Sequence, residues 1–313
     1  MGEKRYRPVT ITPNFHQLGI PSFPAYLSMG DDGMIIEGGT GATFTIIVDQ
    51  IKELGIEPER IQYLTLTHTH PDHIGAVLHL KRLWPHLKVV GSPVAVKLLS
   101  RLSEREDALK EFLLTDRSIT EILFSKGEIA ELPPEPENDP FGVDLVVQEG
   151  DRLDLGSGIV WTIYDTPGHS PCHISLYDER EETLVVGDAT GCYDPEKDIF
   201  WPNYFESLET YCNSIRKLST LSAQRCALSH NGVVEGKVSY YFQKAMRATE
   251  SYHLDMLERL GKGEDPEKIA LEKAKWVNSF TDLQPFEVIH GLTKLMFRRS
   301  QSEAGKENLF TIP

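Results

Sequence analysis

The chain has 313 residues, of which 40% are hydrophobic and 25% charged, and its formal net charge at pH 7 is −15. A chain of this length and composition can bury a large core, either as one domain or as one domain with an appendage. The negative charge disfavours nucleic acid as a partner, and with it nuclease activity, because contacts with phosphate need a basic surface.

The sequence lacks the features of a membrane or secreted protein. No run of about eighteen apolar residues occurs, so we expect neither a membrane-spanning helix nor a membrane partner. Residues 1–8 are charged and have no apolar segment, unlike a secretory signal. We therefore expect a cytoplasmic protein.

The first 54 residues predict three strands and a helix. The strands are residues 8–13, 24–28 and 33–37, and a Gly-Asp-Asp-Gly turn at residues 30–33 indicates a hairpin. Residues 42–54 have apolar side chains at the 3.6-residue spacing of an amphipathic helix.

A dense group of metal-binding side chains follows the apolar run 61–66, which predicts a buried strand. His68, His70, Asp72 and His73 fall within six positions, and zinc, manganese and iron all accept imidazole and carboxylate ligands. His68 and His70 leave the same side of an extended segment and can bind one ion, whereas Asp72 and His73 can point at a neighbouring position. A polar turn with surface histidines is the alternative, which this density disfavours.

Strand and helix then alternate, which predicts an α/β architecture. A helix is expected at residues 74–83, a strand at 88–91 and a second helix at 93–102. Residues 103–130 carry helical apolar stripes with a capped helix start at Ser103. This helical insertion either packs between helices or forms a wall of a substrate cleft.

Strands return in the second half of the chain, at residues 143–148, 159–165, 173–178 and 183–187. The acidic stretch 133–140 before them is expected to be a solvated loop. Two strand-rich halves, each followed by helices, fit a sheet-on-sheet sandwich with helices outside.

Three further candidate ligands directly follow strand-like runs in this half. They are His169 in Thr-Pro-Gly-His-Ser, Asp188 in Val-Gly-Asp-Ala and His230 in Leu-Ser-His-Asn-Gly. Together with the His-x-His-x-Asp-His motif at residues 68–73, this ordered set resembles the signature of the metallo-β-lactamase-fold hydrolases over residues 8 to 235. The resemblance implies an αββα four-layer sandwich with a dinuclear metal centre.

The resemblance also implies a role for each ligand. One metal would be held by His68, His70 and His169, the other by Asp72, His73 and His230, and Asp188 would bridge both. The two divalent ions, zinc by default with iron or manganese as alternatives, would share a hydroxide that attacks a carbonyl. Asp72 is also the candidate catalytic residue, because it could orient the water or accept its proton.

The four cysteines are far apart and form no Cys-x-x-Cys pair, which argues against a sulfur-ligated zinc site and a disulfide framework. They are Cys172, Cys192, Cys212 and Cys226, and we expect core thiols. Cys172 is the exception, because it lies three residues after His169 and could approach the metals.

Beyond residue 235 the pattern is helical, with apolar residues at helical spacing in 237–260, 266–276 and 285–299, the second behind an Asp265 cap. We therefore expect a catalytic domain at residues 1–235 and a helical extension at 236–313 that packs near the active-site cleft.

Four residues are weaker candidates for the site. His173 is either a hydrogen-bonding partner of a ligand or a strand histidine satisfied by the backbone. Tyr193 and Trp201 follow Asp188 and could line an apolar acyl pocket, although aromatic loop residues more often simply pack. His290 would line the cleft only if the last helix folds back over it.

Further details of the sequence narrow the type of hydrolase. The Glu37-Gly38-Gly39 segment, the aromatic stretch that ends at Trp201-Pro202 and the helical tail are similar to the aminobenzoylacetyl-CoA thioesterases of the alkylquinolone pathway. The Thr-Pro-Gly-His segment and the tail also resemble the glyoxalase II-like group. Both groups cleave thioesters, so the resemblance implies hydrolysis of an acyl-CoA or glutathione thioester, although no clear basic cluster for either leaving group is visible.

Other functions stay open. A lactonase or another ester hydrolase would use the same metals, and a metal-retaining regulatory or interaction protein with little turnover could use the helical tail as its partner surface. A redox diiron enzyme would need a flavin or another electron donor. The expected partner is a small acyl ester or thioester, and a homodimer is one option for assembly.

Overall fold

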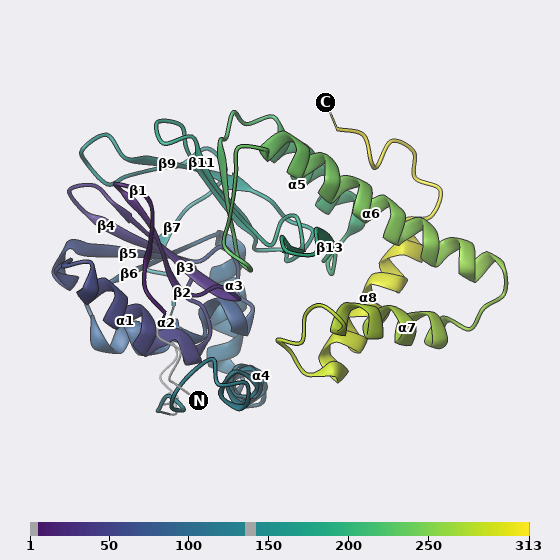
Figure 1. The fold of residues 1–313 in the computed structure, drawn as a ribbon, viewed down its shortest axis with the longest axis horizontal. Helices are drawn as coiled ribbons and strands as arrows, with labels where there is room; N and C mark the ends of the chain where they lie inside the picture. The colour runs from purple at the N-terminus through teal and green to yellow at the C-terminus, as the bar shows by residue number, and fades with distance from the viewer. Residues whose placement is uncertain (1–5, 135–141, 313) are drawn as a thin grey trace.

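Two β-sheets packed face to face form the centre of the computed structural model, which describes residues 6–134 and 142–312 (Figure 1). The first sheet has seven strands in chain order. They are β1 (Val9–Thr12), β2 (Phe15–Ile20), β3 (Phe23–Met29), β4 (Gly33–Ile36), β5 (Ile61–Thr65), β6 (Lys88–Gly91) and β7 (Leu145–Val146). Residues 135–140 of the predicted acidic loop lie outside the described residues.

The second sheet has six strands, and a short hairpin lies beside it. In spatial order the six are β15 (Val233–Glu235), β14 (Arg225–Leu228), β11 (Thr183–Gly187), β10 (Ile174–Asp178), β9 (Val160–Asp165) and β8 (Arg152–Asp154). The hairpin pairs β12 (Cys192–Asp194) with β13 (Ile199–Trp201). The aromatic stretch after Asp188 is thus partly strand.

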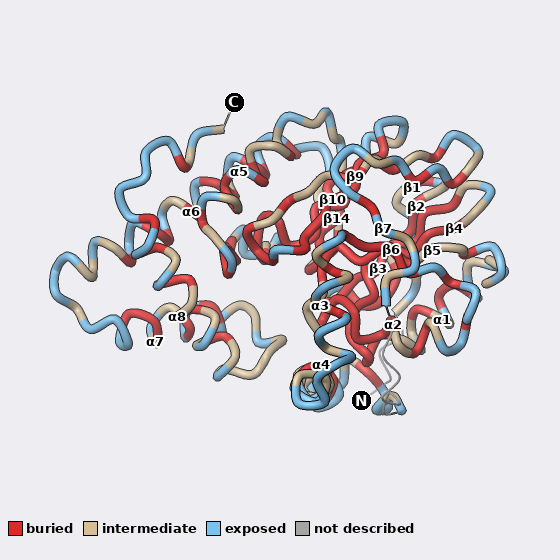
Figure 2. Tube along the Cα trace, turned by 180° about the vertical axis from the view of Figure 1, so that it is seen from behind, coloured by how far each residue is buried: buried red, intermediate tan, exposed pale blue. Residues whose placement is uncertain are grey.

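Apolar side chains fill the space between the sheets. Phe15 and Tyr26 stack with ring centroids 5.4 Å apart, and the Trp161 ring lies 5.5 Å from Phe15. The Trp161 indole N–H donates to Ser28 Oγ at 2.9 Å, so the one polar atom of this large buried side chain is satisfied. Figure 2 shows the two sheets as the most continuously buried part of the chain.

Helices cover both outer faces and complete the predicted αββα sandwich, which is confirmed. On the first sheet they are α1 (Phe44–Glu53), α2 (Pro71–Leu83), α3 (Pro93–Glu104) and α4 (Glu106–Ser125). Their apolar stripes, such as Ile47 and Ile51 of α1, pack on Leu18 and Leu27 of the strands. On the second sheet lies α5 (Leu208–Ser219), beside α6 (Val238–Gly261).

The last three helices form a C-terminal extension. After α6 come α7 (Pro266–Asn278), whose N-cap Asp265 accepts from the Glu267 N–H as predicted, and α8 (Phe286–Ser302). Figure 1 shows α7 and α8 on the side of the molecule away from α1. None of the helices in the described part of the chain is long and apolar enough to cross a bilayer.

The extension shares its hydrophobic core with the second sheet. One cluster joins Leu184 and Val186 of β11 to Met246 of α6, Ile269 of α7 and Met296 of α8. Glu303, directly after α8, accepts from the Leu208 and Glu209 N–H groups at the start of α5. The α8 helix is therefore held firmly against the sandwich.

Several local predictions differ from the structure. Ser103 does not cap a helix, because it lies within α3 and its hydroxyl donates to the Leu99 carbonyl at 3.0 Å. The strand predicted at 143–148 shortens to β7, which pairs with β6 in the first sheet instead of beginning the second. The β2 strand was not predicted, because His16, Gln17 and Gly19 interrupt its apolar pattern.

Candidate metal centre

All seven predicted ligands lie at one edge of the sandwich, just past the carboxyl ends of four strands. His68 and His70 follow β5, and Asp72 and His73 form the first turn of α2, which Pro71 begins. The other three follow β9, β11 and β14. These three strands run in one direction, because β10 lies antiparallel between β9 and β11 while β11 pairs parallel with β14. Their ends therefore deliver His169, Asp188 and His230 to the same rim.

Three imidazole nitrogens meet in the first half of the cluster. His68 Nε2 lies 3.0 Å from His70 Nδ1, and His169 Nε2 lies 3.2 Å from the first and 3.0 Å from the second. Ligands about 2.0 Å from a tetrahedral zinc ion lie about 3.3 Å from one another, so this spacing fits a single ion.

Asp188 connects this group to the second one. Its Oδ2 atom lies 3.3 Å from His169 Nε2, 3.4 Å from His73 Nε2 and 3.7 Å from His230 Nε2. Asp72 Oδ2 completes the second group, at 3.4 Å from His73 Nε2 and 3.8 Å from His230 Nε2. The geometry thus places Asp188 between two potential ion positions.

The cluster has the unsatisfied polar atoms that metal ions would complete. Asp188 Oδ1 and His73 Nε2 are buried and have no hydrogen-bond partner. Buried polar groups without partners are costly, and a divalent cation between these carboxylates and imidazoles would satisfy them. The residues therefore fit a dinuclear centre.

Hydrogen bonds on the far side of the imidazoles fix which nitrogen faces the cluster. His169 Nδ1 lies 3.0 Å from the Asn203 carbonyl oxygen, and His230 Nδ1 lies 2.8 Å from that of Ser22. A carbonyl can only accept, so in both residues Nδ1 carries the proton and Nε2 offers its lone pair to a metal.

Glu37 fixes the orientation of the His73 ring in the same way, although the sequence alone assigned no role to Glu37. Its Oε2 lies 2.9 Å from His73 Nδ1, and its Oε1 accepts from Thr67 Oγ1 at 2.5 Å and from Ser229 Oγ at 2.8 Å. Glu37 has a φ of +71°, which non-glycine residues rarely adopt and which costs about 1–3 kcal/mol. The structure keeps this conformation at the end of β4, where the carboxylate reaches three partners.

His173 lies behind Asp188. Its Nε2 accepts from the Asp188 backbone N–H at 2.9 Å, and its Nδ1 lies 2.8 Å from Thr166 Oγ1. Gly187 has a φ of +64°, and a Cβ atom there would lie 2.5 Å from His173 Nε2. The ring therefore holds the backbone that carries the bridging carboxylate.

The electrostatics separate the two halves of the cluster. Burial lowers the pKa of His68 and His169 well below the usual value, so both rings are neutral ligands. Burial also opposes charge on His73, but the carboxylates of Asp72, Glu37 and Asp188 outweigh it and raise the pKa of His73 well above its usual range. The second group of ligands, around His73, therefore favours a positive charge.

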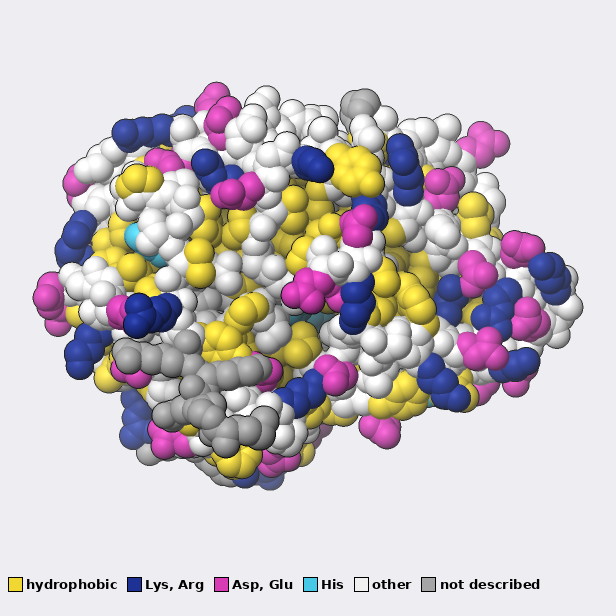
Figure 3. All heavy atoms as spheres, viewed as in Figure 1, with side chains coloured by type: hydrophobic (Ala, Val, Ile, Leu, Met, Phe, Trp, Pro, Cys, Tyr) yellow, Lys and Arg dark blue, Asp and Glu magenta, His cyan; other side chains and the backbone are white. Residues whose placement is uncertain are grey.

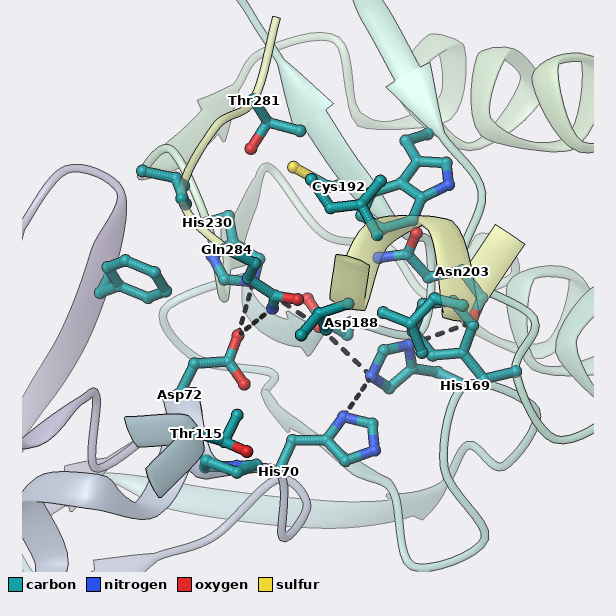
Figure 4. A pocket seen from close by; sticks show the side chains of 18 residues that line it. His70, Asp72, Thr115, His169, Asp188, Cys192, Asn203, His230, Thr281 and Gln284 are labelled. Atoms are coloured by element: carbon teal, nitrogen blue, oxygen red, sulfur yellow. Dashed lines mark hydrogen bonds and ion pairs between the residues drawn. The ribbon is translucent and has the colours of Figure 1, made fainter. Parts of the chain in front are cut away.

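A pocket of about 160 Å³ opens onto this cluster (Figure 4). Its floor is made of the ligands His70, Asp72, His169, Asp188 and His230. The rest of its lining is Phe23, Pro71, Thr115, Cys192, Trp201, Asn203, Phe205, Thr281, Leu283, Gln284, Val288, Ile289 and Leu292. The α4 helix of the predicted insertion contributes Thr115, and α8 with its preceding loop contributes one whole wall.

The weaker candidates lie in different places. Trp201 lines the pocket, whereas Tyr193 lies outside this lining and donates to Asp198 at 2.7 Å. His290 is also outside it, with Nε2 3.3 Å from Glu267 of α7. Cys172 Sγ lies 3.2 Å from Ser170 Oγ and is not among the described residues that could hold an ion together.

Asp116 ties α4 to the metal-bearing helix. Its Oδ1 accepts from the Gly41 N–H at 2.9 Å, and a Cβ atom on Gly75 of α2 would collide with the same oxygen. Burial, and to a lesser degree the charge of Asp72, raises the pKa of Asp116 to about 7. No sequence signal marks this contact.

Replacing Asp116 with asparagine should make folding stability less sensitive to pH. The wild-type carboxyl holds its proton up to about pH 7 when folded but only to about pH 4 when unfolded, so its protonated form contributes stability that is lost as pH rises through this window. The loss is at most about 4 kcal/mol. Melting curves followed by circular dichroism should show the advantage of Asp116→Asn growing from pH 4 to pH 8. A pH-independent difference would contradict this.

Comparisons with known proteins agree with this geometry. Residues 26–230 match the metallo-beta-lactamase superfamily. The chain is 28% identical to the probable metallo-hydrolase YflN of Bacillus subtilis, over 72% of this chain and 82% of that protein. It is 24% identical to the flavo-diiron protein FprA2 of Clostridium acetobutylicum, over 62% of this chain and 42% of that protein.

The chain spans only 18% to 26% of the length of four diflavin flavoproteins of Nostoc sp. and Synechocystis sp. that it also matches. Among solved structures, a metallo-beta-lactamase family protein from Thermus thermophilus aligns with a TM-score of 0.65 and 20% identity. That alignment covers 95% of this chain and 96% of the other, so the fold extends through the C-terminal helices.

Proposed function

Because the chain belongs to the metallo-β-lactamase superfamily, we propose that it is a metal-dependent hydrolase whose substrate is a thioester. One observation carries the proposal: seven side chains converge with the spacing of two ion positions, and the pocket above them has almost no other titratable group. Two divalent ions, when bound, supply an activated water and an electrophile for a carbonyl oxygen.

The side chains of the cluster prepare this chemistry. Neutral His68 and His169 direct their Nε2 lone pairs inward, and Asp188 stays ionised because the surrounding imidazoles lower its pKa more than burial raises it. Burial raises the pKa of Asp72 as well, but the neighbouring imidazoles lower it below the usual range. Asp72 is therefore suited to orienting the attacking water rather than to storing its proton.

The lack of a proton donor in the pocket supports a thioester. Outside the metal ligands, the described residues that line it include no Lys, Arg, Glu or Tyr, and burial raises the pKa of the Cys192 thiol. An alkoxide leaving group would need a proton or its equivalent, whereas a thiolate leaves without one because thiols have a pKa of about 8.5. A thioester is the acyl compound best matched to this lining.

Zinc is the proposed metal, since an all-nitrogen-and-oxygen set suits hydrolytic zinc, and iron is the principal alternative. The name of FprA2, a flavo-diiron protein, supports that alternative. Manganese fits the same ligands. Elemental analysis of protein purified without chelator will distinguish the three.

Removing the metals should abolish activity reversibly. We expect chelator-treated protein to lose at least about 1000-fold in kcat/KM, because metal ions supply several kcal/mol of transition-state stabilisation, and to recover when two equivalents of metal per chain are added back. The assay compares three substrates, which are a thioester of hexanoic acid, ethyl hexanoate and a six-carbon lactone. Full activity in demonstrably metal-free protein would reject the proposal.

The same panel separates the alternatives. Faster turnover of the lactone than of the thioester would favour a lactonase. No turnover of any substrate by protein with its full metal content would favour a regulatory protein.

A further inference from the structure

The C-terminal helices build an apolar wall directly above the metal centre. Val288, Ile289 and Leu292 of α8 line the pocket, and Trp201 and Phe205 line it from the second sheet. Figure 3 shows apolar side chains across the middle of the molecule, with charged side chains distributed around them. A substrate that reaches the metal ligands is therefore in contact with apolar surface on two sides.

Charge is absent from the walls of this pocket. Among the described lining residues, the only carboxylates are Asp72 and Asp188, and both belong to the metal cluster. No lysine or arginine of the described chain lines it. A charged group on the part of the substrate that enters here would lose its hydration and find no counter-ion, which is costly.

Gln284 is a polar residue of the extension that lines the pocket beside the metal cluster. Its Nε2 donates to Asp72 Oδ2 at 3.2 Å, and Figure 4 shows the amide pointing toward this carboxylate. The loop that carries it is held by Lys126, just after α4, which pairs with the Asp282 carboxylate and donates to the Asp282 carbonyl oxygen at 3.2 Å. A fixed amide donor therefore lies beside the position where a carbonyl would be attacked.

From these features, and resting on the proposed hydrolase function, we propose that the pocket binds an uncharged, apolar acyl group. The α8 wall contacts the acyl chain, and the Gln284 amide donates to the acyl carbonyl oxygen. The leaving group points out of the pocket, so its charge matters less than the charge of the acyl group. The extension is thus the substrate-recognition element of the enzyme.

The first experiment varies only the charge of the acyl group. N-acetylcysteamine thioesters of hexanoic and adipic acid share a neutral leaving group and a six-carbon chain, but the adipoyl chain ends in a carboxylate. We expect kcat/KM for the hexanoyl compound to be about 100-fold higher. Leu292→Arg should reduce this ratio at least about tenfold by providing a counter-ion. The control Leu254→Arg, at an exposed position on α6, should leave it unchanged.

The second experiment measures binding without turnover. Ketone analogues of both thioesters, with a methylene in place of sulfur, are titrated into metal-loaded protein by calorimetry. The hexanoyl analogue should bind, the adipoyl analogue should bind at least about 30-fold more weakly, and Gln284→Ala should weaken the first about tenfold with unchanged metal content. The control Gln301→Ala, at the exposed end of α8, should bind like wild type.

The outcomes distinguish this inference from the hydrolase proposal. Equal binding and equal turnover of the two acyl groups would overturn the assignment of the pocket while leaving hydrolysis intact. Tight, selective ketone binding without turnover of any ester would reject hydrolysis but retain the pocket. An unaltered affinity in Gln284→Ala would remove Gln284 from substrate recognition.

Discussion

Asp188→Ala is expected to lower kcat/KM by at least about 1000-fold while the protein remains folded. Asp188 Oδ2 lies within 3.3 to 3.7 Å of one imidazole of the first group and two of the second, so this carboxylate is placed to join the two ion positions. Its loss removes a charge from both positions at once, and electrostatic groups at a reacting centre contribute about 100- to 1000-fold each. Metal content should fall from two ions to one or fewer per chain.

A matched control separates this effect from general damage. Asp178, at the opposite end of β10, is equally buried but accepts from the Arg180 and Glu181 N–H groups of a turn far from the cluster. Asp178→Ala should lower the melting temperature yet keep both ions and, per folded molecule, wild-type activity. A fully active Asp188→Ala enzyme with two bound ions would contradict the bridging role.

Glu37→Gln should weaken metal binding by about 10- to 100-fold, the range found for residues that orient a ligand without touching the ion. The glutamine oxygen can replace Oε1 as acceptor for Thr67 and Ser229. Its NH₂ group would then face the Nδ1–H of His73, where both partners are donors. His73 must either lose this contact or shift its proton to Nε2, which removes the lone pair from the ion.

Competition with a chromophoric chelator will measure this affinity, and Glu235→Gln is the control. Glu235 is an exposed carboxylate that pairs with Arg225 at the edge of the second sheet, outside the cluster. We expect its substitution to leave metal binding unchanged. If Glu37→Gln also binds both ions with wild-type affinity, Glu37 does not orient His73.

The ligands and the sandwich could be predicted because their signals are local. His68, His70, Asp72 and His73 are neighbours in the chain, and the strands that bring them to the rim show plain apolar runs. The strands β9, β11 and β14 run in the same direction because β10 pairs antiparallel with both β9 and β11, and β11 pairs parallel with β14.

The residues around the ligands could not be predicted in the same way. Gln284 is 212 positions from Asp72, and its amide reaches the carboxylate only because α8 packs back against the sandwich. Glu37 was visible as the residue before two glycines, but its positive φ and its contact with His73 depend on the pairing of β4 with β5. Asp116 contacts Gly41 across helices whose packing no spacing rule specifies.

The helix α5 was not predicted, although its sequence does carry a local signal. Leu208, Tyr211, Ile215 and Leu218 have a regular helical spacing, and Ser207 caps the first turn by accepting from the Thr210 N–H. Periodicity could have identified this helix. The N–H groups at the start of α5 donate to the Glu303 side chain and thereby hold the end of α8.

The apolar cluster that runs from β11 through α6 and α7 to α8 makes the sheet and the terminal helices one cooperative unit. Heating should therefore melt the ion-binding rim and the wall above it in a single transition. A movement that opened the wall alone would have to expose Met246, Met256 and Met296 to water. Smaller movements are expected instead at the groove between α4 and the start of α8, which shares Thr115 and Val288 with the lining of the pocket.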